Sequence, residues 1–210
     1  MYVSEKIVIS FFLLHLGKIS DYMQELSDAM LWKALKNGEL KAFSTIYKAY
    51  YPRLYAYGLK ISKTPITTED TLQDFFVYVY EHRENLSSLE TIAPYLFSSY
   101  RRLLIKTLKK NSKLISFDEL KSTVVDIQFS PEELLIQQES ETFKNKNLSA
   151  LLNKLPKRQK EAIYLKYHVG LNTNDIATIM DLNYQSASNT IHKAIKNLRA
   201  NVALSALINS

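Results

Sequence analysis

Apolar side chains recur at steps of three and four along most of the chain, which is the spacing of helices that bury one face. The last quarter contains two such runs, separated by Asp-Leu-Asn at 181–183. The apolar positions of the first run are Ile176, Ala177, Ile179 and Met180. Asn172 precedes this run and is suited to accept a backbone N–H at a helix start, and Asp-Leu-Asn is suited to a tight turn. The pattern therefore predicts two helices joined by a turn, a helix-turn-helix.

The second helix of this pair is expected over residues 184–198, and its two sides differ in chemistry. The apolar side carries Ala187, Ile191, Ala194, Ile195 and Leu198. The opposite side carries Gln185, Ser186, Ser188, Asn189, His192, Lys193 and Lys196. These polar groups suit base edges and phosphates, and no carboxylate stands among them. A merely solvated helix face would show the same pattern. Because basic residues outnumber acidic ones from Lys154 to Arg199, we predict that this helix binds DNA.

Further helices are predicted in the first half of the chain. Asp28 is suited to cap a helix over 29–36, and Asn37-Gly38 predicts a turn before a long helix that begins at Glu39. Pro52 is expected to bend or restart that helix. A second capped start is predicted at 66–70. The buried face that follows it is formed by Leu72, Phe75, Phe76, Val79 and Tyr80. A basic helix is expected over 94–110, after a loop at 85–91.

Composition supports an all-α protein with a nucleic-acid partner, and the length suits one domain or two small helical domains. The chain has 210 residues, a net charge of +6 and a sequence pI of about 9.2, with only four Gly and five Pro. The lack of Cys excludes disulfides and thiolate zinc sites, and the four His are scattered. The sequence contains neither a Gly-rich phosphate loop nor a nucleophile near a histidine. We therefore expect no catalytic residue, metal, cofactor or small-molecule substrate, and no enzyme.

Two stretches depart from this pattern. Residues 7–16 form an apolar run whose flanks lack the basic start and the cleavage site of a signal peptide, and the run is too short to span a bilayer. The alternatives are a buried extra helix, a membrane-surface anchor, or a translation start at Met23 or Met30. We expect no stable membrane insertion and treat 1–24 as an atypical extension. Acidic residues dominate 116–141, which predicts an exposed connector that ends near the helix-start signal at 130–133.

Two motifs carry a resemblance to one protein family. The segment TEDTLQDFFVYVYEHR at 68–83 and the segment LPKRQKEA at 155–162 are similar to signatures of the extracytoplasmic-function class of sigma-70 factors. The lysine-rich style and the segment at 94–97 resemble the Bacteroidetes branch. The resemblance implies sigma region 2 over 25–112, an acidic linker over 113–130, and sigma region 4 over 131–205, the last with a winged-helix-like helix-turn-helix.

The resemblance also implies which residues meet which partner. Contacts to core RNA polymerase are expected from Asp70, Gln73 and Asp74, with helix capping as the alternative explanation of Asp70. At the minus-10 element, bases would stack on Tyr95 and Tyr100, and phosphates would meet Arg101, Arg102, Lys106 and Lys109. At the minus-35 element, the expected contacts are Gln185, Ser186, Ser188, Asn189, His192, Lys193 and Lys196, with Lys157 and Arg158 on phosphates.

The expected function is that of a cytoplasmic alternative sigma factor. It would bind core RNA polymerase and promoter DNA, and an anti-sigma factor would control it. Two other classes fit the same helix-turn-helix. A stand-alone transcriptional regulator would not need the helix around residues 69–83, and a protein-interaction adapter would keep the fold without DNA affinity.

Overall fold

The computed structural model describes residues 26–111, 125–130 and 142–208, and every regular element in these ranges is a helix. The chain forms two compact units that divide after Asn111. The apolar run at 7–16 and the helix-start signal at 130–133, apart from Ser130, lie outside the described residues. Among those described, every helix is too short or too polar to cross a bilayer.

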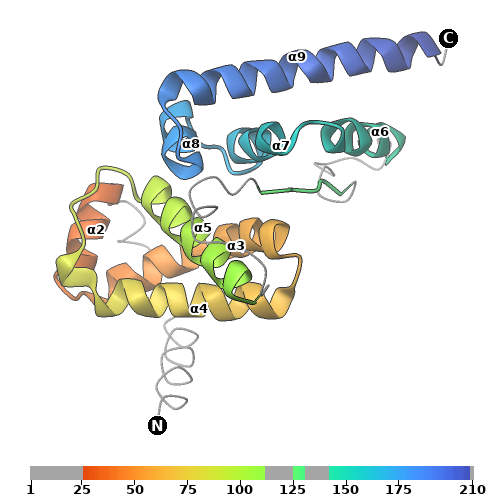
Figure 1. Ribbon diagram of the computed structural model, residues 1–210. Coiled ribbons are helices and arrows are strands. Elements are labelled where there is room, and N and C mark those ends of the chain that lie inside the picture. The colour runs from red at the N-terminus through yellow and green to blue at the C-terminus, as the bar shows by residue number, and fades with distance from the viewer. Residues whose placement is uncertain (1–25, 112–124, 131–141, 209–210) are drawn as a thin grey trace. The chain divides into compact units, whose positions relative to one another are not determined.

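From residue 26 onward, the N-terminal unit is a bundle of four α-helices and one short 3-10 turn (Figure 1). The helices are α2 (Asp28–Lys36), α3 (Leu40–Ser62), α4 (Pro65–Glu81) and α5 (Ile92–Asn111), with η2 (Arg83–Asn85) between the last two. The core lies where α3 meets the other three helices. Its largest fully buried side chains include Trp32, Tyr57, Phe97 and Tyr100. Helix α3 runs through Pro52 as one continuous helix, so the predicted restart does not occur.

Three helix starts differ from the prediction, two because of local residues and one because of a side chain distant in sequence. Ser27 caps α2, while the carboxylate of Asp28 accepts the backbone N–H of Ile92 at 2.8 Å and so begins α5 earlier than expected. Helix α4 begins at Pro65, which fits the first helical position because its missing N–H would have no partner there. The predicted start at 66–70 is therefore inside the helix.

The C-terminal unit holds the predicted helix-turn-helix. Its elements are α6 (Thr142–Asn153), α7 (Lys157–Ile163), the π-helical turn η6 (Tyr164–His168), α8 (Thr173–Met180) and α9 (Tyr184–Ile208). Helix α9 packs on α6, α7 and α8, and Ala187 and Ala194 at this contact are fully buried. Helix α9 ends ten residues later than predicted, since neither Gly nor Pro follows Leu198 to stop it.

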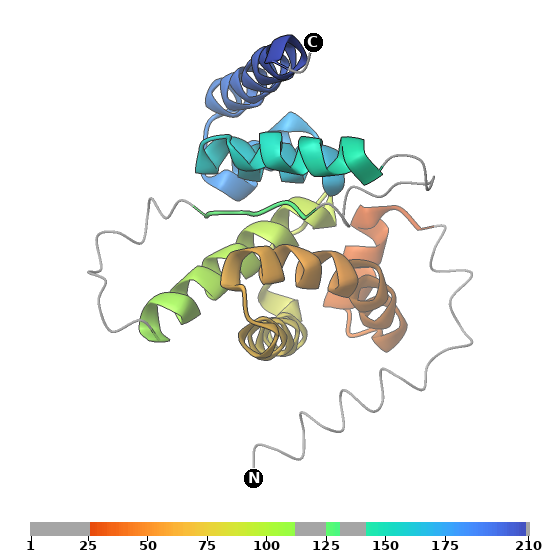
Figure 2. The same cartoon turned by 90° about the vertical axis from the view of Figure 1, so that its right-hand side faces the viewer.

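Residues 125–130 also belong to this unit, which corrects the prediction of an exposed connector. They run beside α6 and α7 in an extended conformation (Figures 1 and 2). Val125, Ile127 and Phe129 alternate inward and are buried, and the ring of Phe129 packs on Tyr164 with centroids 6.3 Å apart. Every second residue of the segment is apolar, which is the spacing of an extended segment with one buried face. The prediction missed this alternation because it was based on the acidic residues of the surrounding stretch. We call residues 125–130 the strap.

Candidate nucleic-acid interface

The two helix starts of the helix-turn-helix are fixed by local side chains, as predicted. The Asn172 side chain accepts the N–H of Asp175 at 2.9 Å, and the Asn183 side chain accepts the N–H of Ser186 at 2.7 Å. Between the helices Asp181 adopts the left-handed conformation with φ of 55°. All four apolar positions predicted for α8 are buried. Short-range hydrogen bonds and a small apolar core therefore fix the turn and the start of α9.

Helix α9 presents the predicted polar residues on one side. At 100° per residue, the seven residues from Gln185 to Lys196 fall within less than half of the helix circumference. Gln185, Asn189, His192, Lys193 and Lys196 are exposed, and Ser186 and Ser188 are half-buried. The Gln185 amide donates to the Asn189 carbonyl oxygen at 3.2 Å, which leaves the N–H₂ of the exposed Asn189 side chain as a donor. This arrangement offers base-edge donors and acceptors flanked by ammonium groups.

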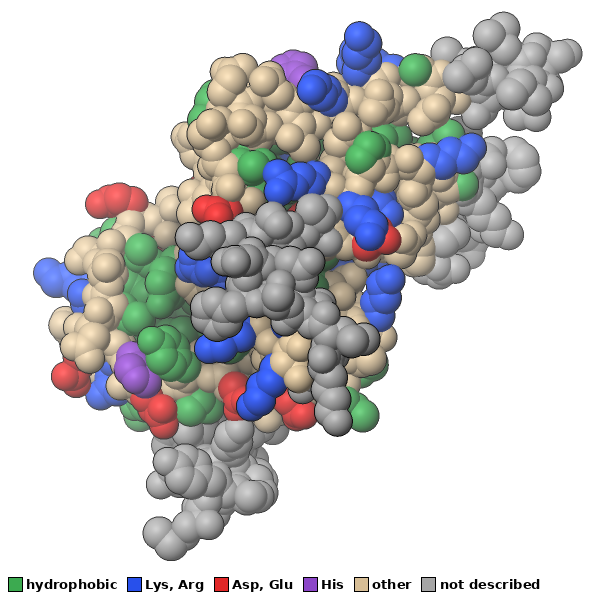
Figure 3. Space-filling model, viewed as in Figure 1, with side chains coloured by type: hydrophobic (Ala, Val, Ile, Leu, Met, Phe, Trp, Pro, Cys, Tyr) green, Lys and Arg blue, Asp and Glu red, His purple; other side chains and the backbone are tan. Residues whose placement is uncertain are grey.

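The start of α7 adds two further cations to this unit. Lys157 and Arg158 are exposed in the first turn of α7, whereas Lys160 and Glu161 of the same motif are buried. The Asn197 side chain of α9 donates to the Gln159 side chain of α7 at 3.0 Å. The two helices are thus tied together, so Lys157 and Arg158 keep a fixed position relative to α9. Figure 3 shows more basic than acidic side chains on the visible face of this unit.

In the N-terminal unit, helix α5 separates the predicted minus-10 residues into two groups. Tyr95, Arg102, Lys106 and Lys109 share one side of the helix, and Arg101 lies apart from them. The Arg102 guanidinium donates to Ser99 at 3.3 Å. Burial raises the pKa of Tyr95, Tyr78 raises it further, and Ser99 and Arg102 act in the opposite direction. The half-buried Tyr95 ring therefore lies beside a guanidinium on a basic helix face.

Tyr100 is in the core, so we withdraw it as a base-stacking group. Its ring is fully buried against Phe75, with centroids 5.7 Å apart, and its hydroxyl donates to the Thr68 carbonyl at 3.3 Å. Gly58 on α3 makes this packing possible, because a Cβ at that position would lie 2.1 Å from the Tyr100 hydroxyl. The tyrosine points to the side of α5 opposite the basic residues, which a residue-type argument did not detect.

Helix α2 anchors both ends of the loop before α5. The Trp32 indole donates to the Ser87 carbonyl at 2.9 Å, and Asp28 accepts from Ile92. The Trp32 and Tyr95 rings make an edge contact at 5.2 Å. Because the Trp32 ring is buried, its hydrogen bond to Ser87 holds the loop to the core, although the two residues are far apart in the sequence.

Sequence reasoning missed an aromatic pair beside Tyr95. Tyr78 and His82 stack at 4.1 Å on the exposed side of α4, and Tyr78 is 52% exposed. Their spacing of four residues on a helix was the available signal. Exposed apolar side chains cover much of the N-terminal unit in the view of Figure 3.

Helix α4 carries the predicted polymerase contacts as an exposed stripe. Asp70, Gln73 and Asp74 are all exposed, and Glu81 continues the same side of the helix. Since α4 begins at Pro65, no acidic residue occupies its first turn. Helix capping therefore does not account for Asp70.

Family models match both units of the chain. The model described as Sigma-70 region 2 matches residues 46–114, and the model described as Sigma-70, region 4 matches residues 145–198. Together they cover most of the described residues, with one model matching each unit. The chain belongs to the sigma-70 family, in its extracytoplasmic-function group.

Individual relatives agree with this assignment. The ECF RNA polymerase sigma factor SigX of Bacillus subtilis is 24% identical over 169 residues, which are 78% of this chain and 85% of the relative. SigM of the same organism is 24% identical over 156 residues, 74% of this chain and 91% of the relative. The fold resembles CnrH in its complex with the cytosolic domain of CnrY, with a TM-score of 0.54, 16% identity, and coverage of 84% and 97% of the two chains. It also resembles the sigma factor RpoE of Bartonella quintana in complex with the anti-sigma factor NepR, with a TM-score of 0.53, 17% identity, and coverage of 78% and 98%. The protein is an alternative sigma factor, which directs transcription.

Proposed function

We propose that α9 of the C-terminal unit enters the major groove of the minus-35 element. The observation that carries this proposal is the single exposed side of α9, where Gln185, Asn189 and Lys193 stand on a helix whose other side is the core. Asn189 would pair with adenine through its amide, and Lys193 would reach guanine or a phosphate. Lys157 and Arg158, held by the contact between α7 and α9, would bind the phosphate backbone and set the register.

The N-terminal unit would hold the separated strand of the minus-10 element. The exposed cations Arg102 and Lys106 and the half-buried Lys109 on α5 supply phosphate contacts. Tyr95, with the neighbouring Tyr78 and His82, supplies aromatic surface on which an unpaired base can stack. Arg101, which lies apart from this face of α5, would add positive charge beside it. The anchoring of the loop by Trp32 keeps the surface in one conformation before DNA arrives.

Core RNA polymerase would bind the stripe of α4. Asp70, Gln73 and Asp74 expose two carboxylates and an amide on one side of a helix whose other side is the core of the unit. Such a stripe is suited to a basic helical partner, because charge complementarity steers association and fixes the register. The clamp helices of the polymerase are the expected partner.

An anti-sigma protein would control the factor. CnrH and RpoE are each described in complex with a partner protein, the cytosolic domain of CnrY and the anti-sigma factor NepR respectively. By analogy, such a partner would cover surfaces on both units of this chain until a signal releases it. The factor would act in the cytoplasm, where the polymerase and the promoter are. We also propose that it belongs to the Bacteroidetes branch of the family, a proposal supported by its lysine-rich, glycine-poor sequence.

The test is capture of purified core RNA polymerase by the tagged protein, followed by transcription from promoter DNA. Gln73→Ala/Asp74→Ala should reduce capture at least tenfold, because the stripe loses its central amide and one carboxylate. Glu39→Ala removes an exposed carboxylate that makes no capping hydrogen bond and is the matched control. It should bind like the wild type.

Other results would support the alternatives. DNA binding without polymerase capture would indicate a stand-alone helix-turn-helix regulator. If substitution of Asn189 and Lys193 reduced neither DNA binding nor polymerase capture, the result would indicate an adapter that uses the fold for protein contacts.

A further inference from the structure

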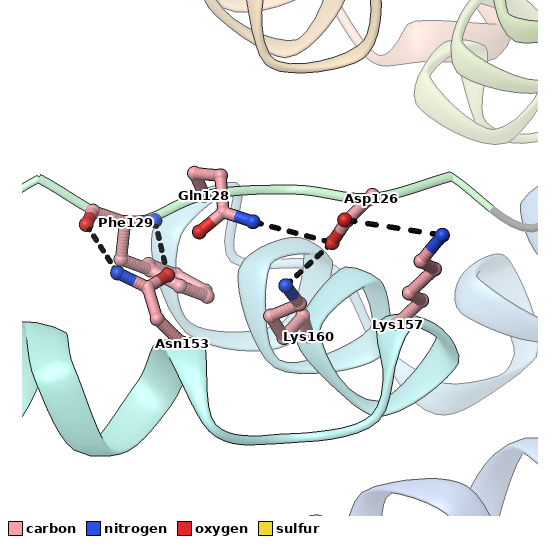
Figure 4. Close-up of polar contacts among 6 residues, drawn as sticks. All are labelled: Asp126, Gln128, Phe129, Asn153, Lys157 and Lys160. Carbon is pink, nitrogen blue, oxygen red and sulfur yellow. Dashed lines mark hydrogen bonds and ion pairs between the residues drawn. The ribbon is translucent and has the colours of Figure 1, made fainter.

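The strap is built into the C-terminal unit by polar as well as apolar contacts (Figure 4). The Phe129 N–H donates to the Asn153 side-chain oxygen at 2.8 Å, and the Asn153 amide donates back to the Phe129 carbonyl at 2.9 Å. One side chain at the end of α6 thereby satisfies both backbone groups of a strap residue, as a neighbouring strand would. Together with the buried side chains of Val125, Ile127 and Phe129, these bonds hold the other residues of the strap in place.

Asp126 is one of these residues, and it lies between two lysines of α7. Its carboxylate pairs with the Lys160 ammonium at 2.5 Å and with the Lys157 ammonium at 3.9 Å, and Gln128 donates to it at 3.4 Å. The two lysines differ in exposure. The Lys160 side chain is 4% exposed, so its ammonium group can pair only within the protein. The Lys157 side chain is 58% exposed and can contact a ligand.

We propose that Asp126 sets the DNA affinity of the C-terminal unit by sharing Lys157 with the phosphate backbone. The inference rests on the proposed phosphate contact of Lys157. A phosphate that approaches Lys157 also meets the Asp126 carboxylate, which repels it and competes for the same ammonium. Lys160 is buried too deeply to replace Lys157. The strap therefore lowers attraction to DNA of any sequence while the base-reading side of α9 stays unchanged, which favours specific over non-specific binding.

The test compares four versions of the full chain: wild type, Asp126→Asn, Lys157→Met and the double variant. Binding to a fluorescein-labelled duplex of random sequence is measured by anisotropy from about 50 to 200 mM salt. Asp126→Asn keeps an acceptor for Lys160 and should strengthen binding about three- to fivefold at low salt, with a log–log salt slope steeper by up to about 0.9. Lys157→Met should weaken binding and make the slope shallower by a similar amount.

The double variant separates charge sharing from a structural role. If Asp126 acts through Lys157, Asp126→Asn should change DNA binding less than 1.5-fold, roughly the precision of the assay, when Lys157 is Met. An equal effect in both backgrounds would overturn the proposal and assign Asp126 to the support of Lys160 alone. Glu39→Gln removes the same unit of charge elsewhere and should leave affinity close to that of the wild type.

Two further arms keep the result interpretable. If Asp126→Asn does not fold, Asp126→Asn/Lys160→Met replaces the buried pair and serves as the test variant with the same expected gain in affinity. Lys193→Ala reports on the proposed function itself. If it weakens binding while Asp126→Asn has no effect, only this inference fails. If neither Lys193→Ala nor Lys157→Met changes binding, the proposed DNA contacts fail and this inference fails with them.

Discussion

At the scale of single residues, Gly58 and Tyr100 show how one position decides the role of another. The absence of a side chain at Gly58 lets the Tyr100 ring lie against α3, with its hydroxyl bonded to the Thr68 carbonyl. Burial in this setting raises the pKa of Tyr100 far above that of an exposed tyrosine, so the ring stays neutral. Tyr95, five residues earlier on the same helix, keeps part of its ring at the surface.

Gly58→Ala should destabilise the N-terminal unit. Alanine favours a helix interior by about 1 kcal/mol relative to glycine. Its Cβ would nevertheless meet the Tyr100 hydroxyl at 2.1 Å and two ring carbons at 2.9 Å. The overpacking should cost about 3 kcal/mol, which leaves a net loss of about 2 kcal/mol. Urea unfolding followed by circular dichroism measures the difference. Tyr100→Phe in the Gly58→Ala background should recover part of the loss, and an unchanged midpoint in Gly58→Ala would refute the packing argument.

At the scale of elements, the strap shows how a segment without regular secondary structure becomes part of a helical domain. The strap contributes three buried apolar side chains. The backbone N–H and C=O of Phe129 both bond to the side chain of Asn153. It lies before the residues matched by the family model of region 4, which begin at 145. The folded C-terminal unit therefore extends beyond its helix-turn-helix and includes residues of the acidic stretch.

Asn153→Ala should lower the stability of the C-terminal unit by about 1–3 kcal/mol, because the N–H and C=O of Phe129 lose their partners in a partly buried site. Asn174→Ala changes an exposed amide on α8 and is the control, with an expected effect below about 0.5 kcal/mol. Hydrogen exchange provides the direct readout. The Phe129 amide should be protected in the wild type and should exchange faster in Asn153→Ala, and equal rates would contradict this role of Asn153.

At the scale of the whole molecule, the two units carry different surfaces on one chain. The stripe of Asp70, Gln73 and Asp74, proposed to bind polymerase, lies on α4, and the polar side proposed to enter the DNA groove lies on α9. Because both surfaces belong to one chain, each raises the local concentration of the other near a promoter that the polymerase has reached. If each surface binds its proposed partner, promoter-specific transcription requires both units.

Substitutions in the two units should therefore separate the activities. Lys193→Ala should leave polymerase capture within twofold of the wild type and reduce promoter-dependent transcription about five- to 100-fold, in line with the loss of one base or phosphate contact. Gln73→Ala/Asp74→Ala should reduce both capture and transcription. Titration of core polymerase into each variant, with run-off transcription from the same samples, makes the comparison. Equal loss of capture in both variants would mean that the division by unit is wrong.

The sequence by itself determined the features that depend on neighbours along the chain. The caps at Asn172 and Asn183, the turn at 181–183, the four buried positions of α8 and the polar side of α9 all follow from hydrogen bonds and spacing within a few residues. The start of α5 at Ile92, the burial of Tyr100 and the pairing of Asp126 with Lys157 and Lys160 were decided only by the tertiary structure. In each of these a side chain meets a partner at least 30 residues away, and the spacing of residues along the chain holds no record of such a contact.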